Sequence, residues 1–393
     1  MHPALRSVRN FFVSLQLTVV LLVMSMLLVF VATLDQVNLG IWAVQAKYFR
    51  SFFVMWPVPN SSLSLPIFPG GYLVGGFLLI NLLCAHIYRF RLTWRKAGIL
   101  LAHAGVILLL LGELISGLLQ KDSVMQLFEG ETSKYSESFR EHELVLMDKS
   151  NPAYDDVVAI PEAVLADKLS LQHPKLPFLV RVKEYHANAA LQMREPAAAG
   201  ATEPAVAGMG SRIVMTPLPL TYKPDEVNRP GAYVELTGPD GSLGTWLVSP
   251  QLGAPQRFNY QGHTWEIALR LKRFYKPFSL TLVKITNDVY PGTDIPKNFA
   301  SRVHLRSDDG KEDRDITIFM NNPLRYGGLT FYQYQMNAAN QMSAFEVVRN
   351  PGWLLPYVAC IMIGLGLLIQ FGITLFGFIN KRAAAAAVVA SSQ

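Results

Sequence analysis

Four long apolar runs constrain the fold of this chain more than any other feature. A helix needs about 20 consecutive apolar residues to cross the hydrocarbon core of a bilayer. Runs of that kind cover residues 11–34, 72–90, 97–119 and 352–380. Charged residues make up only 16% of the chain, against roughly 25% in soluble domains. The sequence therefore predicts a membrane protein with three transmembrane helices near the N-terminus and one near the C-terminus.

The distribution of charge argues against nucleic acid as a partner. The chain has a formal net charge of +6, but its basic excess lies on short segments next to the apolar runs. Such segments encode orientation, because cytoplasmic loops are enriched in Lys and Arg. We therefore expect both termini, the turn between the second and third spans and the tail 381–393 to be cytoplasmic. The residues that carry this prediction are Arg6, Arg9, Arg89, Arg91, Arg95, Lys96, Lys381 and Arg382.

The first apolar run is interpreted as a retained helix. It is longer than the 7–15-residue core typical of a signal peptide. The aromatic segment 35–71 after it forms the first outer loop and is expected to lie along the membrane surface, where aromatic rings prefer the headgroup zone. The alternative is a docking face for a partner helix.

Residues 120–351 are expected to form a large domain on the non-cytoplasmic side. Apolar and polar residues alternate in segments 178–183, 232–236, 265–271, 279–284 and 301–305, which is the pattern of half-buried strands. Turn sequences at Pro239 and Asp308 separate such runs. The predicted fold of this domain is all-β, either a sandwich or a partly closed barrel.

Few residues outside the spans suggest chemistry. Cys84 and Cys360 lie inside apolar runs, and the chain has no CxxC motif, which excludes a thioredoxin-like site and a CxxCH haem attachment motif. No catalytic residues are predicted. The isolated outer histidines are interpreted as ordinary strand or loop residues; they are His142, His173, His186, His263 and His304.

Two histidines inside the spans form the candidate site. Ionisable groups within a span are costly and point to function. Counted from the turn that joins their helices, His86 and His103 lie at similar depth. A neutral imidazole in an apolar site is a good axial ligand for haem iron. His103 and His86 are thus candidate haem-binding residues, and the basic turn could meet the propionates.

Plainer interpretations of these residues stay open. His86 lies next to Tyr88 and Arg89 and could be an interfacial residue whose ring reaches the headgroups. His103 could make a structural hydrogen bond, with Gly98 and Gly105 allowing close helix approach. Glu113 is near the outer end of its span, where a carboxylate can reach water.

Several stretches resemble ResB-type cytochrome c biogenesis proteins, the system II proteins of haem delivery and attachment. The likeness covers nearly the whole chain in the same order. The matching stretches are 12–22 (FVSLQLTVVLL), 33–41 (TLDQVNLGI), 95–112 (RKAGILLAHAGVILLLLG), 127–131 (LFEGE), 290–301 (YPGTDIPKNFAS) and 322–333 (NPLRYGGLTFYQ).

The resemblance implies a function and partners. It implies a subunit of a complex in the bacterial inner membrane that carries haem b transiently across the membrane and presents it to apocytochrome c. It also implies a ResC/CcsA-type membrane partner with a tryptophan-rich loop, which this chain lacks. The family's haem-ligating histidine corresponds to His103, whereas His86 matches no family motif. The chain is not expected to be a complete enzyme by itself, because it would hold the haem but not supply the thiols.

The sequence leaves two other functions open. The chain could be a membrane-anchored scaffold without a cofactor, or an accessory subunit of a transporter. A transporter usually shows repeated span patterns and interrupted helices at mid-membrane, and neither is evident in the sequence.

Overall fold

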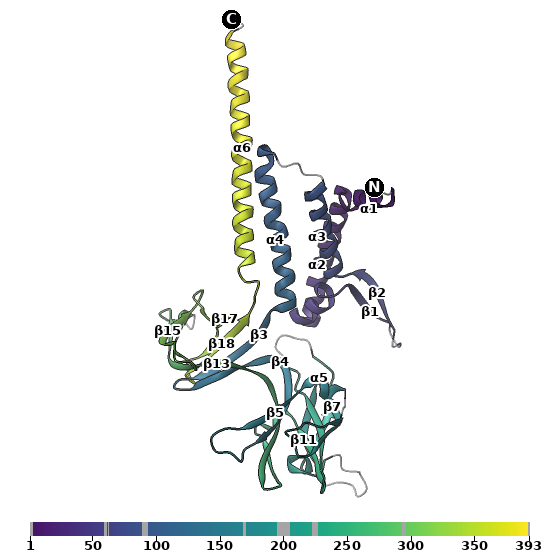
Figure 1. Ribbon diagram of the computed structural model, residues 1–393, viewed down its shortest axis with the longest axis vertical. Helices are drawn as coiled ribbons and strands as arrows, with labels where there is room; N and C mark the ends of the chain where they lie inside the picture. Colours follow the sequence, from purple (N-terminus) through teal and green to yellow (C-terminus); the bar gives the residue numbers. More distant parts are fainter. Residues whose placement is uncertain are drawn as a thin grey trace. The chain divides into compact units, whose positions relative to one another are not determined.

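The chain divides into two compact units, which are described separately. In the computed structural model the described residues are 3–391, apart from 59–60, 62, 89–92, 168–169, 195–204, 222–226 and 293–295. Met1–Gln120 and Asn350–Gln393 form one unit, here called the membrane unit, and Lys121–Arg349 form the other, called the β domain (Figure 1).

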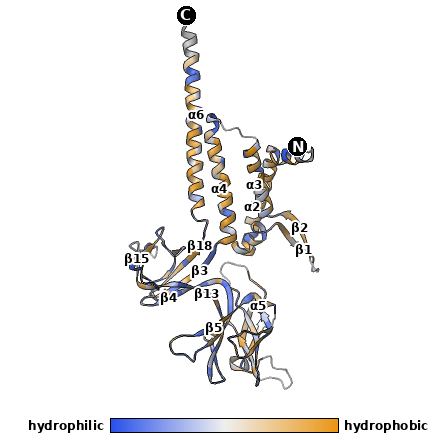
Figure 2. Cartoon of the chain, viewed as in Figure 1, coloured by the Kyte–Doolittle hydropathy of each residue, from blue (hydrophilic) through white to orange (hydrophobic). Residues whose placement is uncertain are grey.

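The membrane unit is helical. Four of its helices are long and apolar enough to cross a membrane, three before the β domain and one after it, which confirms the predicted pattern of spans. Apolar residues dominate all four (Figure 2). The helices are α1 (Pro3–Phe12), α2 (Leu15–Val44), α3 (Gly71–Tyr88), α4 (Ala97–Leu119) and α6 (Leu355–Ser391).

The bounds of two spans differ from the prediction. The helix α2 starts at Leu15, capped by Ser14, and continues beyond residue 34 because the first glycine after the apolar run is Gly40, where a left-handed φ of 72° interrupts the helix. The expected loop 35–71 therefore starts as helix, continues as the short π-helix Gln45–Phe49 and ends in a hairpin of β1 (Phe53–Pro57) and β2 (Ser64–Pro69). Helix α6 runs on to Ser391 through the alanine-rich segment expected to be a tail.

The helix pair α4–α6 packs through glycine. Gly98, Gly105 and Gly112 lie on one face of α4 and are buried. A Cβ atom at Gly98 would lie 2.5 Å from both the Gly366 carbonyl oxygen and the Gln370 nitrogen of α6. The backbones thus approach each other closely, as small residues allow in membrane helix pairs.

The buried side chain of Asn81 on α3 forms hydrogen bonds with residues at the α1–α2 junction. Asn81 is 2% exposed. Its Oδ1 accepts a hydrogen bond from Thr18 Oγ1 at 2.6 Å, and its Nδ2 donates to the Phe12 and Ser14 carbonyls at 2.7 and 3.1 Å. These carbonyls lie where α1 ends and α2 begins, so Asn81 satisfies backbone groups that a helix break exposes.

The β domain confirms the predicted all-β fold. Its largest sheet has the order β15-β14-β13-β4-β3-β18-β17-β16, with β12 added beside β13 and β5 beside β4, and a second sheet has the order β11-β10-β7-β6. The strands are β3 (Lys121–Phe128), β4 (Thr132–Asp148), β5 (Asp156–Pro161), β6 (Ser170–Leu171), β7 (Leu179–His186), β8 (Ala189–Met193), β9 (Ile213–Pro217), β10 (Gly231–Gly238), β11 (Gly241–Val248), β12 (Gln256–Tyr260), β13 (His263–Val289), β14 (Pro296–Ser307), β15 (Asp313–Phe319), β16 (Leu324–Tyr326), β17 (Leu329–Asn337) and β18 (Met342–Arg349), with the short helix α5 (Glu162–Ala166).

The long strand β13 takes part in two hydrophobic cores, and the long strand β4 takes part in the first of them. Their halves near Leu144 and Ile267 pack with β5 and β12 against the β6-β7-β10-β11 sheet, as in a sandwich. The other half of β13, around Leu280, joins β3, β14, β15, β17 and β18 around a second core. Because β15 also packs against β16 and β17, this second half is a nearly closed barrel. Segments 265–271 and 279–284, predicted as separate strands, are thus parts of one strand.

Candidate functional site

The two membrane histidines lie against each other. His86 is on the last turn of α3 and His103 is on the second turn of α4. Their ring centroids are 5.3 Å apart, with the ring planes at 58°, and both side chains are half-buried. The structure thus brings the two predicted site residues together. Arg89 and Arg91 of the connecting turn lie outside the described residues.

Backbone carbonyls orient both imidazoles. His103 Nδ1 lies 2.8 Å from the Ile99 carbonyl oxygen, and His86 Nδ1 lies 3.2 Å from the Leu82 carbonyl oxygen. A carbonyl only accepts, so each contact places the ring proton on Nδ1 and the lone pair on Nε2 in the neutral imidazole. Histidines that ligate metals usually hold their other ring nitrogen in this way.

The ring contact limits how a haem could be held. Two axial imidazoles face each other across the iron, whereas these rings touch. In this arrangement only one of the two imidazoles could hold an iron through Nε2, and the ring contact does not distinguish His103 from His86. Both histidines could act as an axial pair only if α3 and α4 separated slightly.

Helices α3, α4 and α6 also contain one carboxylate and two thiols. Glu113 is exposed near the C-terminal end of α4, Cys84 is half-buried and Cys360 is exposed. Among the described residues, no group of three or more His, Cys, Asp or Glu side chains could hold a metal ion.

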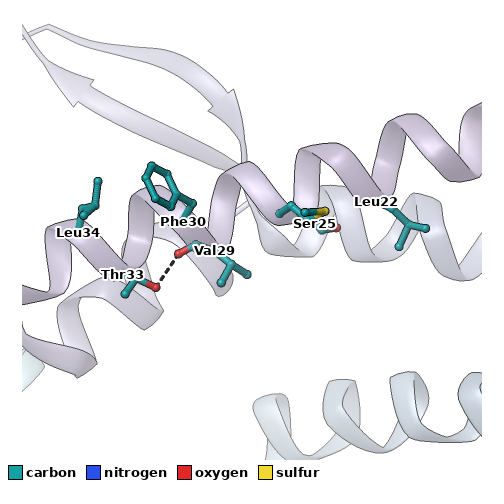
Figure 3. A pocket seen from close by; sticks show the side chains of 7 residues that line it. Leu22, Ser25, Val29, Phe30, Thr33 and Leu34 are labelled. Atoms are coloured by element: carbon teal, nitrogen blue, oxygen red, sulfur yellow. Dashed lines mark hydrogen bonds between the residues drawn. The ribbon is translucent and has the colours of Figure 1, made fainter.

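A shallow hollow of about 660 Å³ lies along α2 (Figure 3). Ser25 and Thr33 contribute its hydroxyl groups, but they donate to the Leu21 and Val29 carbonyls of their own helix at 2.9 and 2.8 Å. The rest of the lining is apolar, so the hollow suits a lipid chain or another helix more than a polar ligand. Its lining residues are Leu22, Ser25, Met26, Val29, Phe30, Thr33 and Leu34.

Most histidines of the β domain pair with carboxylates. His142 is buried beside Glu162, which also accepts from the Tyr185 hydroxyl. Burial opposes ionisation of Glu162, but the hydrogen bonds from His142 and Tyr185 outweigh it and lower its pKa. His186, His263 and His304 also contact Asp or Glu, whereas His173 accepts from the Lys175 backbone. These are contacts that stabilise strands and loops.

Lys276 is a buried charge that sequence reasoning missed. It lies on β13 and is 8% exposed. Its Nζ donates to Ser136 Oγ at 2.6 Å and to the Phe274 carbonyl at 3.0 Å, and Ser136 Oγ lies 2.9 Å from Ser123 Oγ. Burial lowers the pKa of Lys276 to about 8. Its burial could have been predicted from strand alternation, because Lys276 lies on the same strand face as the apolar residues Phe278 and Leu280.

This amine and hydroxyl have the composition of a serine–lysine nucleophile. However, Ser136 is 1% exposed, so its hydroxyl cannot reach a substrate from solvent in this conformation. The group is better explained as a buried polar cluster at the edge of the second core.

Fold and comparisons together define a class of protein: a multi-span membrane protein with a large all-β domain. Residues 261–341 match the ResB-like family. A stretch of 92 residues is 35% identical to Protein NrfI of Wolinella succinogenes, covering 23% of this chain and 10% of that protein. These matches confirm the resemblance predicted from the sequence.

The family match falls in the β domain, from the turn before β13 to the turn between β17 and β18. It supports a role in cytochrome c biogenesis. It does not extend to α3 or α4, so the roles of His86 and His103 depend on their own geometry.

Proposed function

We propose that this chain is the haem-handling subunit of a membrane complex for cytochrome c biogenesis. The observation that carries the proposal is the contact of His103 with His86 inside the spans, each Nδ1 held by a carbonyl of its own helix. Ionisable side chains inside membrane spans are costly and point to a function. The ligand is haem b, bound transiently as cargo.

The residues of this site take different roles in the proposal. His103 presents Nε2 to the haem iron. His86 lies beside it, either as a second ligand after a small separation of the helices or as a polar neighbour that keeps the site from closing. Arg95 and Lys96, in the 3-10 turn just before α4, would attract the anionic propionates.

The complex is proposed to lie in the bacterial inner membrane. The basic residues next to the spans support a cytoplasmic position for the termini and an outer position for the β domain. A ResC/CcsA-type partner would take over the haem, and apocytochrome c would supply the thiols for its attachment. The chain would then contribute to a cytochrome c synthetase without being a complete enzyme.

Replacing His103 tests this function in cells. In a strain that depends on this chain and its partner for cytochrome c, we expect His103→Ala to lower the yield of haem-containing cytochrome c roughly tenfold or more, because an iron ligand is lost. Haem staining of membrane and soluble fractions measures the yield. His173→Ala, an exposed change in the β domain, is the control and should leave the yield unchanged. Equal yields from the two variants would rule out the proposed role.

A further inference from the structure

The hairpin β1–β2 is an uncharged extension of the membrane unit. No Asp, Glu, Lys or Arg occurs between Ser51 and Tyr88, a segment that includes both strands and all of α3. In Figure 2 the two strands have the apolar colouring of the neighbouring helices. A hairpin at the surface of a soluble domain normally has one polar face.

Both faces of this hairpin are apolar. The strand register pairs Val54 with Phe68 and Trp56 with Leu65 on one face, while Phe53 and Met55 point to the other. Val54 is buried against α2 and the π-helix, but Trp56 is 55% exposed. The large apolar side chains that remain exposed are Phe53, Met55, Trp56, Leu63, Leu65 and Ile67.

Hydrogen bonds fix the base of the hairpin to the first turn of α3. The Gly70 nitrogen donates to the Phe52 carbonyl at 2.8 Å, and the Tyr72 nitrogen donates to the Ser51 carbonyl at 3.2 Å. The rings of Phe52 and Tyr72 lie 5.8 Å apart, and a Cβ atom at Gly71 would lie 2.4 Å from the Phe49 carbonyl oxygen. Since α3 is a membrane span, the hairpin is held at the boundary of the bilayer.

Three environments are available at that boundary, and one of them suits the hairpin. Water would leave its apolar faces exposed. The hydrocarbon core would leave the backbone groups of its two open edges without partners. The headgroup zone offers apolar contact to the faces and hydrogen-bonding groups to the edges, and tryptophan prefers this zone.

We propose that the β1–β2 hairpin inserts into the headgroup zone of the lipid bilayer beside α3 and anchors the membrane unit there. The occupant of its apolar faces is lipid, because these faces continue the lipid-facing surface of the adjoining span without a charged residue between them. This anchor does not depend on haem, so its test is independent of the proposed function.

Depth-dependent quenching of Trp56 tests the anchor. The full-length protein is purified without a partner and placed in bilayers whose acyl chains carry bromine either close to the headgroup or close to the bilayer centre. The emission of Trp56 is the difference between the wild type and Trp56→Phe. We expect the shallow bromine to quench this emission more strongly than the deep bromine, and acrylamide in the water to quench it weakly.

A second position supplies the water-exposed reference. Tyr154 is 60% exposed in the β domain, so Tyr154→Trp in the Trp56→Phe background should be quenched by acrylamide and by neither brominated lipid. If Trp56 behaves like this reference, the hairpin is in water and the proposal fails. If neither lipid nor acrylamide quenches Trp56, protein covers it and the proposal also fails. If Trp56→Phe does not fold, the same comparison is made with Leu65→Trp against Tyr154→Trp.

Discussion

A single methyl group added at Gly98 is expected to destabilise the membrane unit clearly. The Gly98→Ala methyl would meet the Gly366 oxygen and the Gln370 nitrogen at 2.5 Å. Both are backbone atoms and cannot rotate away, so α4 and α6 must move apart. Overpacking of this kind costs about 1–3 kcal/mol, and we expect the upper part of that range.

The same helix offers a matched control. A Cβ atom at Gly117 would have no neighbour within 4 Å, and alanine is favoured over glycine in helices by about 1 kcal/mol. Gly117→Ala should therefore leave the melting temperature unchanged or slightly higher, whereas Gly98→Ala should lower it clearly. Thermal unfolding of the purified protein in detergent measures both. Equal melting temperatures would show that the α4–α6 contact is not as close as described.

Replacing Lys276 by methionine is expected to stabilise the β domain. The lysine is buried without an ion pair among the described residues, and its pKa is lowered from 10.5 to about 8. Holding its charged form in the folded domain therefore costs about 3 kcal/mol, at roughly 1.4 kcal/mol per pH unit. Methionine fills a similar volume without the charge. Part of the gain is lost because Ser136 loses one of its two hydrogen-bond partners, so we expect a net gain of about 1–2 kcal/mol at pH 7.

The wild type should also show a characteristic pH dependence. Between about pH 8 and pH 10.5 the folded state has released the Lys276 proton while the unfolded state still holds it. Unfolding then takes up a proton, so this residue makes the protein more stable as the pH rises through that range. Lys276→Met should remove this increase. Chemical unfolding followed by the circular dichroism of the strands measures both effects.

Lys272 on the same strand is the control for this experiment. It forms an exposed ion pair with Glu141 at 2.7 Å, and such pairs contribute little to stability. Lys272→Met is thus expected to change the free energy of unfolding by less than about 0.5 kcal/mol. A Lys276→Met protein no more stable than Lys272→Met would mean that the amine reaches water.

The membrane helices could be predicted from sequence because lipid imposes a simple requirement of length and apolarity. The third span was predicted with the bounds that α4 has. The end of the first span could not be predicted, because the sequence after Leu34 is compatible with either a helix or a loop and local packing decides between them. Gly40 determines where the regular helix of α2 is interrupted. The hairpin was missed because its strands are apolar on both faces and show no alternation.

The β domain shows a related limit. Alternation located the strands around Ile267 and Leu280, but it could not show that they are one strand serving two cores. Polar residues such as Arg273 and Lys276 interrupt the pattern where the strand passes from one core to the other. Pairing with β4 and β14 keeps the backbone extended there.

The candidate site was predicted from two different signals. His103 followed from its position inside a span and from a resemblance, and His86 from its depth by helical rise alone. Neither signal could give the ring contact, because it depends on how α3 and α4 rotate about their axes. Lys276 was missed because a lone lysine in a strand is usually exposed.

The absorbance spectrum of the complex purified with its membrane partner tests the central claim most directly. We predict a Soret band in the wild type, its loss in His103→Ala, and its return when imidazole is added to His103→Gly, because a free imidazole can replace the missing ligand. His86→Ala should retain haem, with a shifted band if His86 is also a ligand. A Soret band in His103→Ala equal in position and intensity to that of the wild type would contradict the account.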